Sequence, residues 1–448
     1  MKLFLRSLSC LLLIVMLSTF CLWRNQILPD LSQLTAFMQS TADRLGELAS
    51  LVQGGGNGGN APVDEGGDFP EYALAEELDT ALENHIVSQM LAHSARIDLS
   101  GYNLSQEKTQ AVFSAIRYSH PELFFWGNAE NYVESLDGVT TSFIPDYLYD
   151  AATTATMMAS YEANLDAICA GAPTTSEFDK WLYVHDYFVK NYTYDYTYTV
   201  RDAYTLFTEN TGVCQAYMLG VIAVAEELGL ETVPVTSNAM KHAWNLIKLD
   251  GAWYHMDVTW DDSVSYATYT SYQHFLCSDA RFYHMSVPHH DWNATEQATD
   301  TKYDSVIWHA ALTPMVKSGG IYYVAVTVDN SGNSRVMGKV YSGGDPAAMT
   351  ACFDVNAVWP ADTVGSYYTD CFAGLAVYGD YIIYNTNNTL RAYHTGTGEH
   401  RQIAMFSMRS GESIYGIVSI SGNTLTYLVA DDPYGDETPS YVPYSIAL

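Results

Sequence analysis

Basic residues are scarce in this 448-residue sequence, and their scarcity excludes several partners. Lys and Arg number 20 against 51 Asp and Glu, which gives a formal net charge of -31 at pH 7. A field of this sign repels nucleic acid and anionic membrane surfaces. It favours solubility and would suit a lysine-rich partner. We therefore expect no nucleic-acid binding.

Cysteine is also sparse, with seven residues in all, and none has the spacing of zinc ligands. Cys10 and Cys21 lie in an apolar N-terminal run. If one of the other five is a working thiol, four remain. These four fit two disulfides in three connectivities, or isolated buried thiols equally well: Cys169, Cys277, Cys352 and Cys371.

Long apolar runs are missing beyond the first residues, where one run resembles a targeting segment. Lys2 and Arg6 precede 16 mostly apolar residues from Leu8 to Trp23, and no small-residue cleavage site follows. We predict an uncleaved N-terminal membrane anchor in preference to a cleaved signal peptide. In both cases the chain is exported, either to the extracellular face of the membrane or as a secreted protein.

Apolar residues make up 48% of the chain and charged residues 16%, so a sizeable core can form. Composition and periodicity divide the chain into six segments. We predict an anchor or signal at 1–28, a heptad-like stalk helix at 29–53, a Gly-rich linker at 54–68, an α+β module at 69–165, a central domain at 166–304 and a β-rich accessory domain at 305–448. The helix at 29–53 fits a coiled-coil stalk and a lone amphipathic helix on the membrane surface equally well.

Local patterns give elements within these segments. Helical periodicity marks Tyr72–Leu91 and Gln106–Tyr118, and Pro121–Tyr149 has a strand-like composition. In the accessory domain, Gly319–Val324 and Gly379–Tyr384 each read as a turn followed by a Tyr-containing strand. Such units resemble the blades of a propeller or a repeated sheet.

The central domain contains an apolar, helix-compatible stretch that begins at Cys214 and runs to Leu228. Gly229 is a typical stop signal, and Gly212 permits a sharp entry turn. A thiol in the first turn gains from the helix dipole and from free backbone N–H groups. The same groups can hold an oxyanion. The alternative is a plain core cysteine.

The next two apolar runs, 241–249 and 252–259, flank Asp250-Gly251, which is a strong two-residue hairpin signal. Pairing outward from this turn places His242 and Asp257 on one face as diagonal neighbours, with Cα atoms about 7–8 Å apart. An imidazole and a carboxylate at that separation can form a hydrogen bond. A slip of one residue would separate them.

Packing the Cys214 helix across this face places its thiol beside His242 and defines three roles. Cys214 is the nucleophile, His242 takes the thiol proton and later protonates the leaving amine, and Asp257 holds the imidazole tautomer. Alone, His242 fits a core histidine satisfied by a backbone carbonyl, and Asp257 fits a turn or cap residue. The shared geometry favours the triad.

These motifs resemble the bacterial transglutaminase-like domain family. The resemblance rests on Gly212–Tyr217, His242–Asn245 and Trp253–Asp261, with Cys, His and Asp in the family's order, and on a similar lead-in at Phe178–Tyr194. It implies a papain-like α+β core and thiol chemistry on amides. Ala216 departs from the family, where Gly is usual. Residues 69–165 also resemble a module found before that domain.

Several further residues are candidates for lesser roles. Gln215 and Tyr204 are possible oxyanion donors, and Trp244 could wall the acyl cleft or be a core aromatic. One His-rich segment lacks the helical spacing of metal ligands, and we predict a surface loop without zinc there: His284, His289, His290 and Asp291.

Taken together, the sequence predicts an exported cell-surface thiol enzyme, without metal or cofactor, that acts on protein or peptide amide bonds in a cell-wall setting. Water would resolve the acyl-enzyme in a protease or amidase, and a lysine amine would resolve it in a transglutaminase. We favour hydrolysis, because no acceptor site is evident. The alternative is a non-catalytic surface-binding module with a vestigial triad, in which the Tyr-rich β domain binds.

Overall fold

The computed structural model describes residues 79–127, 131–262, 270–328, 337–360, 367–368, 370–409, 412–430 and 442–448. The predicted anchor, stalk helix and linker lie outside these residues. Among the helices of the described part, none has the length and apolarity needed to cross a membrane. The described chain combines α-helices with antiparallel sheets, as the predicted α+β class requires.

The first folded part pairs helices with a small sheet, as expected from the sequence. Its elements are α3 (Thr80–Leu91), β1 (Ile97–Asp98), η1 (Ser100–Tyr102), β2 (Leu104–Ser105), α4 (Gln106–Ser119), η2 (Pro121–Leu123), β3 (Tyr132–Leu136) and β4 (Val139–Ile144). The strand-like prediction for 121–149 is wrong at its start, because Pro121 opens a 3₁₀ turn. Helix α5 (Ala151–Cys169) then continues across the predicted domain boundary at 165/166.

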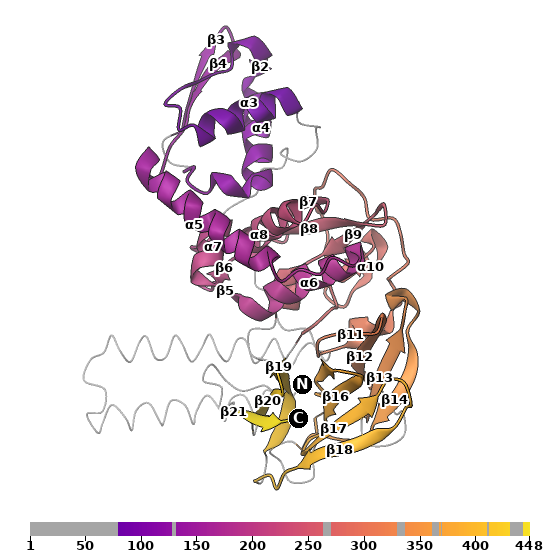
Figure 1. The fold of residues 1–448 in the computed structure, drawn as a ribbon. Helices are drawn as coiled ribbons and strands as arrows, with labels where there is room; N and C mark the ends of the chain where they lie inside the picture. Colours follow the sequence, from indigo (N-terminus) through magenta and orange to yellow (C-terminus); the bar gives the residue numbers. More distant parts are fainter. Residues whose placement is uncertain are drawn as a thin grey trace, which may run out of the picture. The chain divides into compact units, whose positions relative to one another are not determined.

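The central part is built around one buried helix and one antiparallel sheet (Figure 1). The sheet has the strand order β10-β9-β8-β7. The elements are α6 (Glu177–Asn191), β5 (Thr193–Tyr194), α7 (Ala203–Glu209), β6 (Thr211–Gly212), α8 (Cys214–Glu227), β7 (Thr232–Ser237), β8 (His242–Leu249), β9 (Ala252–Met256), α9 (Val258–Asp261), β10 (Phe275–Cys277) and α10 (Asp279–His284).

Helix α8 begins at Cys214, as the sequence predicts, and is buried on nearly every side. A helix that is apolar all round belongs in a core. Gly220 lets α6 and α7 approach closely, since a Cβ there would lie 2.8 Å from Phe188 and 2.9 Å from Leu206. Gly212 also serves packing, because a Cβ would lie 2.8 Å from that of Ala216. It stands in a short strand, so the predicted turn role is not the reason for this glycine.

The hairpin of β8 and β9 has the predicted turn and register. Asp250 and Gly251 have φ of +53° and +83°, which identifies the primed turn that matches strand twist. Leu249 pairs with Ala252, and the pairing continues to Asn245 and Met256. This register fixes which side chains share a face with the His242 imidazole.

Replacing Gly251 by Val should destabilise the protein by about 1–2 kcal/mol, since a β-branched residue is strained at positive φ. Denaturant unfolding of the variant measures this loss. Gly101→Ala is the matched control, because a Cβ there meets nothing within 4 Å. Equal losses in the two variants would contradict a conformational role for Gly251.

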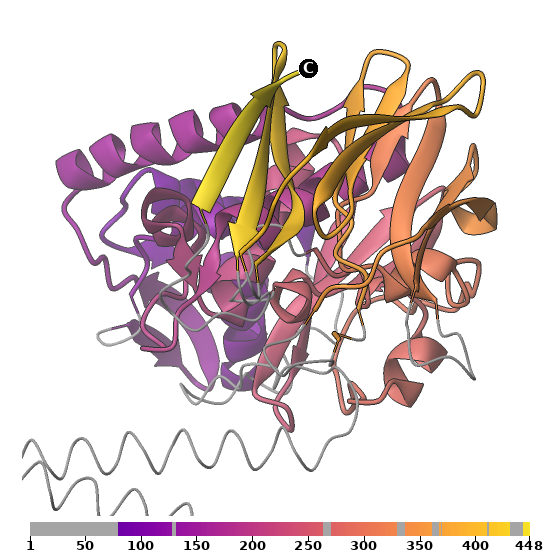
Figure 2. The ribbon, with the colours of Figure 1, turned by 90° about the horizontal axis from the view of Figure 1, so that it is seen from below.

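In its described residues the C-terminal part forms three antiparallel sheets, as the predicted β-rich fold requires (Figure 2). Glycine turns with positive φ at Gly319 and Gly379 precede Tyr-containing strands, as predicted. The elements are η3 (Ile307–Ala310), β11 (Val316–Ser318), β12 (Ile321–Val328), β13 (Met337–Gly343), η4 (Pro346–Ala348), β14 (Thr350–Val355), β15 (Leu375–Tyr378), β16 (Tyr381–Asn385), β17 (Thr389–His394), β18 (His400–Met405), β19 (Ser413–Ser421), β20 (Thr424–Ala430) and β21 (Val442–Ala447).

His120 joins α3 to the end of α4 through two carboxylates. Its Nδ1 lies 2.8 Å from Glu122 and its Nε2 lies 3.0 Å from Glu83. Burial opposes protonation, but the two carboxylates raise the pKa of His120 to about 9. The folded state therefore holds this proton more tightly than the unfolded state, whose pKa is about 6.5.

We expect His120→Gln to cost about 2 kcal/mol of stability below pH 6.5, where the wild-type contribution is complete. The contribution is lost as the pH rises from 6.5 through 9, so the two proteins should converge above pH 9. Unfolding curves at pH 6 and pH 9.5 measure the difference. The same difference in unfolding free energy between the wild type and His120→Gln at both pH values would contradict the ionic role of His120.

Candidate active site

The structure brings His242 and Asp257 into direct contact. Nε2 of His242 lies 2.7 Å from Oδ2 of Asp257, and the two residues are 1% and 0% exposed. The sequence placed them as diagonal neighbours on paired strands. Strand β9 in fact ends at Met256, and Asp257 is the N-cap of α9. Both predicted roles of Asp257, helix cap and histidine partner, are therefore present in one carboxylate.

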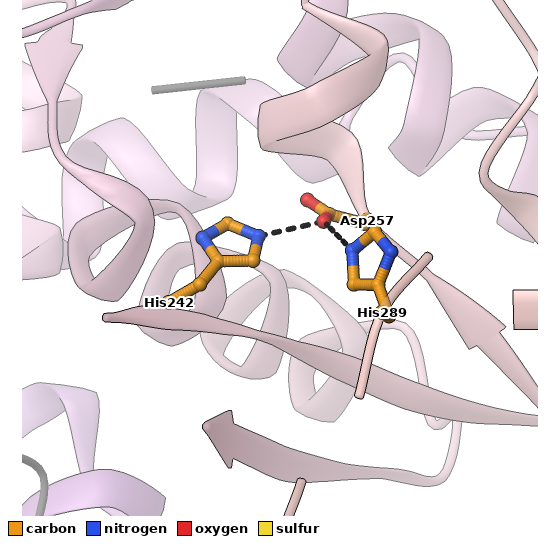
Figure 3. A group of neighbouring side chains, drawn as sticks. All are labelled: His242, Asp257 and His289. Atoms are coloured by element: carbon orange, nitrogen blue, oxygen red, sulfur yellow. Dashed lines mark hydrogen bonds and ion pairs between the residues drawn. The ribbon is translucent and has the colours of Figure 1, made fainter. Parts of the chain in front are cut away.

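The Asp257 carboxylate has a separate set of donors at each oxygen. Oδ1 accepts the backbone N–H groups of Thr259 and Trp260, each at 3.1 Å. Oδ2 faces two imidazoles, His242 at 2.7 Å and His289 at 2.9 Å (Figure 3). Burial disfavours the charged carboxylate, but its interactions with both histidines hold the pKa of Asp257 well below its usual range. Asp257 is therefore an anion at every physiological pH.

The charge on Asp257 acts on the neighbouring imidazole. Burial opposes protonation of His242, but the charge and hydrogen bond of Asp257, with a smaller contribution from Cys214, raise the pKa of His242 to about 10. Nδ1 of His242 is buried and makes no hydrogen bond of ordinary geometry. Since Nε2 is held by Asp257, Nδ1 is the nitrogen left to exchange a proton with the thiol.

The thiol belongs to the first residue of α8 and is fully buried. No disulfide joins the five cysteines of the described part, so the two disulfides considered above are absent there and the cysteines are thiols. The N-cap of α8 is Val213, whose side chain caps nothing, whereas Ser or Asp caps the other α-helices of the described ranges. The N-cap of α8 therefore supplies no side-chain acceptor to the first N–H groups of the helix, which suits an oxyanion site.

Backbone and side-chain bonds hold the elements of the site together. Asn245 of β8 donates to the carbonyl of Met218 in α8 at 3.2 Å, and Trp181 of α6 donates to the carbonyl of Lys248 in β8 at 2.8 Å. These bonds tie the thiol helix and the hairpin to a common core. The relative position of Cys214 and His242 is thus set by packing.

A second buried cluster supports the Asp257 backbone. Asp261 contacts His185 at 3.1 Å and His274 at 3.0 Å through different oxygens, and it accepts a hydrogen bond from Ser271 at 2.8 Å. The carbonyl of His274 in turn accepts the N–H of Asp257 at 3.0 Å. Burial opposes the charge on Asp261, but the two histidines lower its pKa. This cluster fixes the segment against which Asp257 rests.

The structure places the lesser candidates as follows. Trp244 stacks on the His242 ring at 5.4 Å and donates its Nε1–H to Nδ1 of His255 at 2.9 Å. It therefore packs on the His242 imidazole. Tyr204 stacks on Phe124 with ring centroids 4.7 Å apart, against the hydrophobic core. Gln215 is the second residue of α8 and is half-buried.

His289 was missed as a site residue. The sequence assigned it to a surface loop, but its side chain is 0% exposed and touches Asp257. No periodicity or turn signal connects residues 257 and 289, so only the folded loop after α10 reveals the contact. His284, His290 and Asp291 behave as predicted, since their side chains are partly or well exposed.

His242, Asp257 and His289 present three possible metal-ligand atoms within 4.8 Å of one another. Nitrogen and carboxylate ligands of this kind suit zinc. Hydrogen bonds at 2.7 and 2.9 Å already account for the spacing, with Asp257 accepting from both rings.

An open pocket of about 280 Å³ is lined by Tyr381, His394, Glu399, His400 and Arg401, and it shares no residue with this site.

A thiol at a helix start, an imidazole on a hairpin and a carboxylate at its end are the groups that cysteine-type enzymes use. Residues 166–258 match the family model of the transglutaminase-like superfamily. A search of curated protein sequences found no match to this chain.

Two solved structures are similar to parts of the chain. One is the crystal structure of a TGase, with 20% identity and a TM-score of 0.21, covering 37% of this chain and 50% of that chain. The other was described as a candidate cysteine protease from Cytophaga hutchinsonii, with 14% identity and a TM-score of 0.20, covering 30% and 62%. This chain thus spans about half of the first structure's length.

Proposed function

We propose that the protein is an exported cell-surface thiol enzyme that acts on amide bonds of proteins or peptides through an acyl-enzyme at Cys214. The carrying observation is the His242–Asp257 contact at 2.7 Å, which leaves Nδ1 of His242 for the thiol. The matching superfamily model over 166–258 supports the same chemistry. Export is proposed from the apolar N-terminal run.

Each step follows from the positions of these groups. His242 takes the thiol proton, and the sulfur of Cys214 attacks the amide carbonyl. The backbone N–H groups at the start of α8 stabilise the oxyanion. His242 then returns the proton to the leaving nitrogen as the C–N bond breaks and a thioester forms. Asp257 keeps the proton of the imidazole on Nε2 and stabilises the imidazolium.

Resolution of the thioester decides the reaction class. Attack by water releases a carboxylic acid and regenerates the thiol, as in a protease or amidase. Attack by a lysine amine forms a new amide, as in a transglutaminase. We propose hydrolysis as the main reaction, because no part of the sequence indicates an amine acceptor site. The net charge of -31 would suit a lysine-rich substrate or a cell-wall peptide.

Product analysis by mass spectrometry tests this proposal. The full chain is incubated with a mixture of Gln- and Lys-containing peptides in ¹⁸O-water, with and without an added alkyl diamine, beside Cys214→Ala. We expect ¹⁸O in new carboxylates of the wild-type reaction only. Peptides that carry the diamine instead of ¹⁸O would show that the enzyme transfers the acyl group to an amine rather than to water. Unchanged peptides throughout would favour a binding module with a vestigial triad.

A further inference from the structure

His289 occupies a position that the three-residue triad leaves unexplained. It lies in the loop after α10, its side chain is fully buried, and its Nε2 is 2.9 Å from Oδ2 of Asp257. That is the same oxygen that faces His242. The two imidazoles therefore reach one carboxylate oxygen from different sides (Figure 3).

An aromatic cage fixes the His289 ring. Ring centroids of Trp260, Phe282 and Trp244 lie 4.2, 4.3 and 4.9 Å from that of His289. The backbone N–H of His289 donates to the carbonyl of Phe282 at 3.1 Å. The next residue is held as well, because the carbonyl of His290 accepts from Ser237 at 2.9 Å. Ring and loop are therefore both fixed relative to Asp257.

The cage also determines the protonation state of the ring. Burial, together with the nearby His274 and His242, outweighs the attraction of Asp257 and lowers the pKa of His289 to about 3. The ring is thus neutral and carries one N–H. Only an N–H at Nε2 can satisfy the carboxylate oxygen at 2.9 Å, which leaves the lone pair on the buried Nδ1.

We propose that His289 is a positioning residue that donates its Nε2–H to Oδ2 of Asp257 and so aims the carboxylate at His242. With Oδ1 held by the backbone N–H groups of Thr259 and Trp260, this donor prevents the carboxylate from rotating. A neutral donor suits the task, because a second cation would neutralise Asp257 and weaken its hold on the His242 imidazolium. The inference rests on the proposed thiol function.

Two variants separate positioning from simple packing. His289→Phe fills the aromatic cage without a donor, whereas His289→Gln keeps an amide N–H near the position of Nε2. We expect His289→Phe to lower the rate of Cys214 alkylation by iodoacetamide about tenfold and His289→Gln to stay within about threefold of wild type. Equal rates in the wild type and His289→Phe, both folded by circular dichroism, would overturn the proposal.

Nuclear magnetic resonance gives a readout that needs no reaction. In ¹⁵N-histidine-labelled full-length protein, the signals of His289 are identified as those that disappear in His289→Phe. Their chemical shifts should be those of a neutral imidazole with its proton on Nε2 from pH 5 to pH 9. The downfield Nε2–H signal of His242 should persist in His289→Gln and shift or broaden in His289→Phe. A His289 that is cationic at neutral pH, or that carries its proton on Nδ1, would overturn the proposal.

These measurements keep the two proposals distinguishable. Fast alkylation of Cys214 without turnover of any amide would overturn the proposed function alone, and the His289 variants would still be decisive. Alkylation of wild-type Cys214 no faster than that of Cys169 would overturn both. All alkylation rates are measured with and without EDTA. A rate that changes when EDTA is added would show that a metal ion, and not hydrogen bonds from His242 and His289, holds Asp257.

Discussion

Replacing Asp257 by Asn should lower the turnover of a peptide substrate by about 10³–10⁴-fold while the protein stays folded. Asn keeps an Oδ1 that can accept from Thr259 and Trp260, so the cap of α9 survives. Its amide N–H groups, however, would face Nε2 of His242. The imidazole must then move its proton to Nδ1, and it can no longer accept the thiol proton.

The matched control is Asp262→Asn, five residues along the chain. Asp262 is half-buried and accepts a hydrogen bond from Tyr217 at 2.5 Å, and desolvation raises its pKa to about 7. The amide oxygen of Asn can accept the same bond, so turnover should remain close to that of the wild type. A similar loss in the two variants would indicate that Asp257 acts only through local structure.

Removal of the sulfur should have the largest effect of any substitution. Cys214→Ala is expected to abolish turnover, and Cys214→Ser should retain less than about 10⁻³ of it, since a hydroxyl gives up its proton to imidazole far less readily. Initial rates with a peptide that the wild type cleaves measure both. The alanine variant should stay folded, because the substitution removes a single sulfur atom.

Cys169→Ala serves as the control for thiol removal. Cys169 ends α5, is half-buried, and burial raises its thiol pKa to about 11. Alanine is the best helix former, so activity should be unchanged. Residual turnover by Cys214→Ala, equal to that of this control, would mean that the reaction occurs elsewhere in the chain.

Local rules account for the part of the site that the sequence predicted. The Asp250-Gly251 turn fixes the register of β8 and β9. Because side chains alternate between the two faces of a strand, the register determines which side chains lie on the same face of the sheet. An apolar run with a glycine stop gave α8 and placed Cys214 in its first turn. Contacts made within a few residues are visible in a sequence because backbone geometry dictates them.

Tertiary contacts account for the part that was missed. His289 meets Asp257 across 32 residues through an irregular loop, and nothing in its local pattern distinguishes it from the exposed His290. Trp244 was placed on the correct face, but its indole N–H binds His255, which no spacing indicates. The strand prediction at 121–149 overlooked Pro121, whose fixed φ starts a 3₁₀ turn.

The central claim is that a hydrogen-bonded imidazole activates the sulfur of Cys214. The most direct measurement is the rate of iodoacetamide alkylation at each cysteine between pH 5 and pH 9, read by peptide mass spectrometry, in the wild type and in His242→Ala. At neutral pH Cys214 should react faster than glutathione and faster than Cys277 and Cys371, whose thiol pKa values burial raises to about 12. His242→Ala should remove that advantage, and equal labelling of Cys214 in the two proteins would contradict the account.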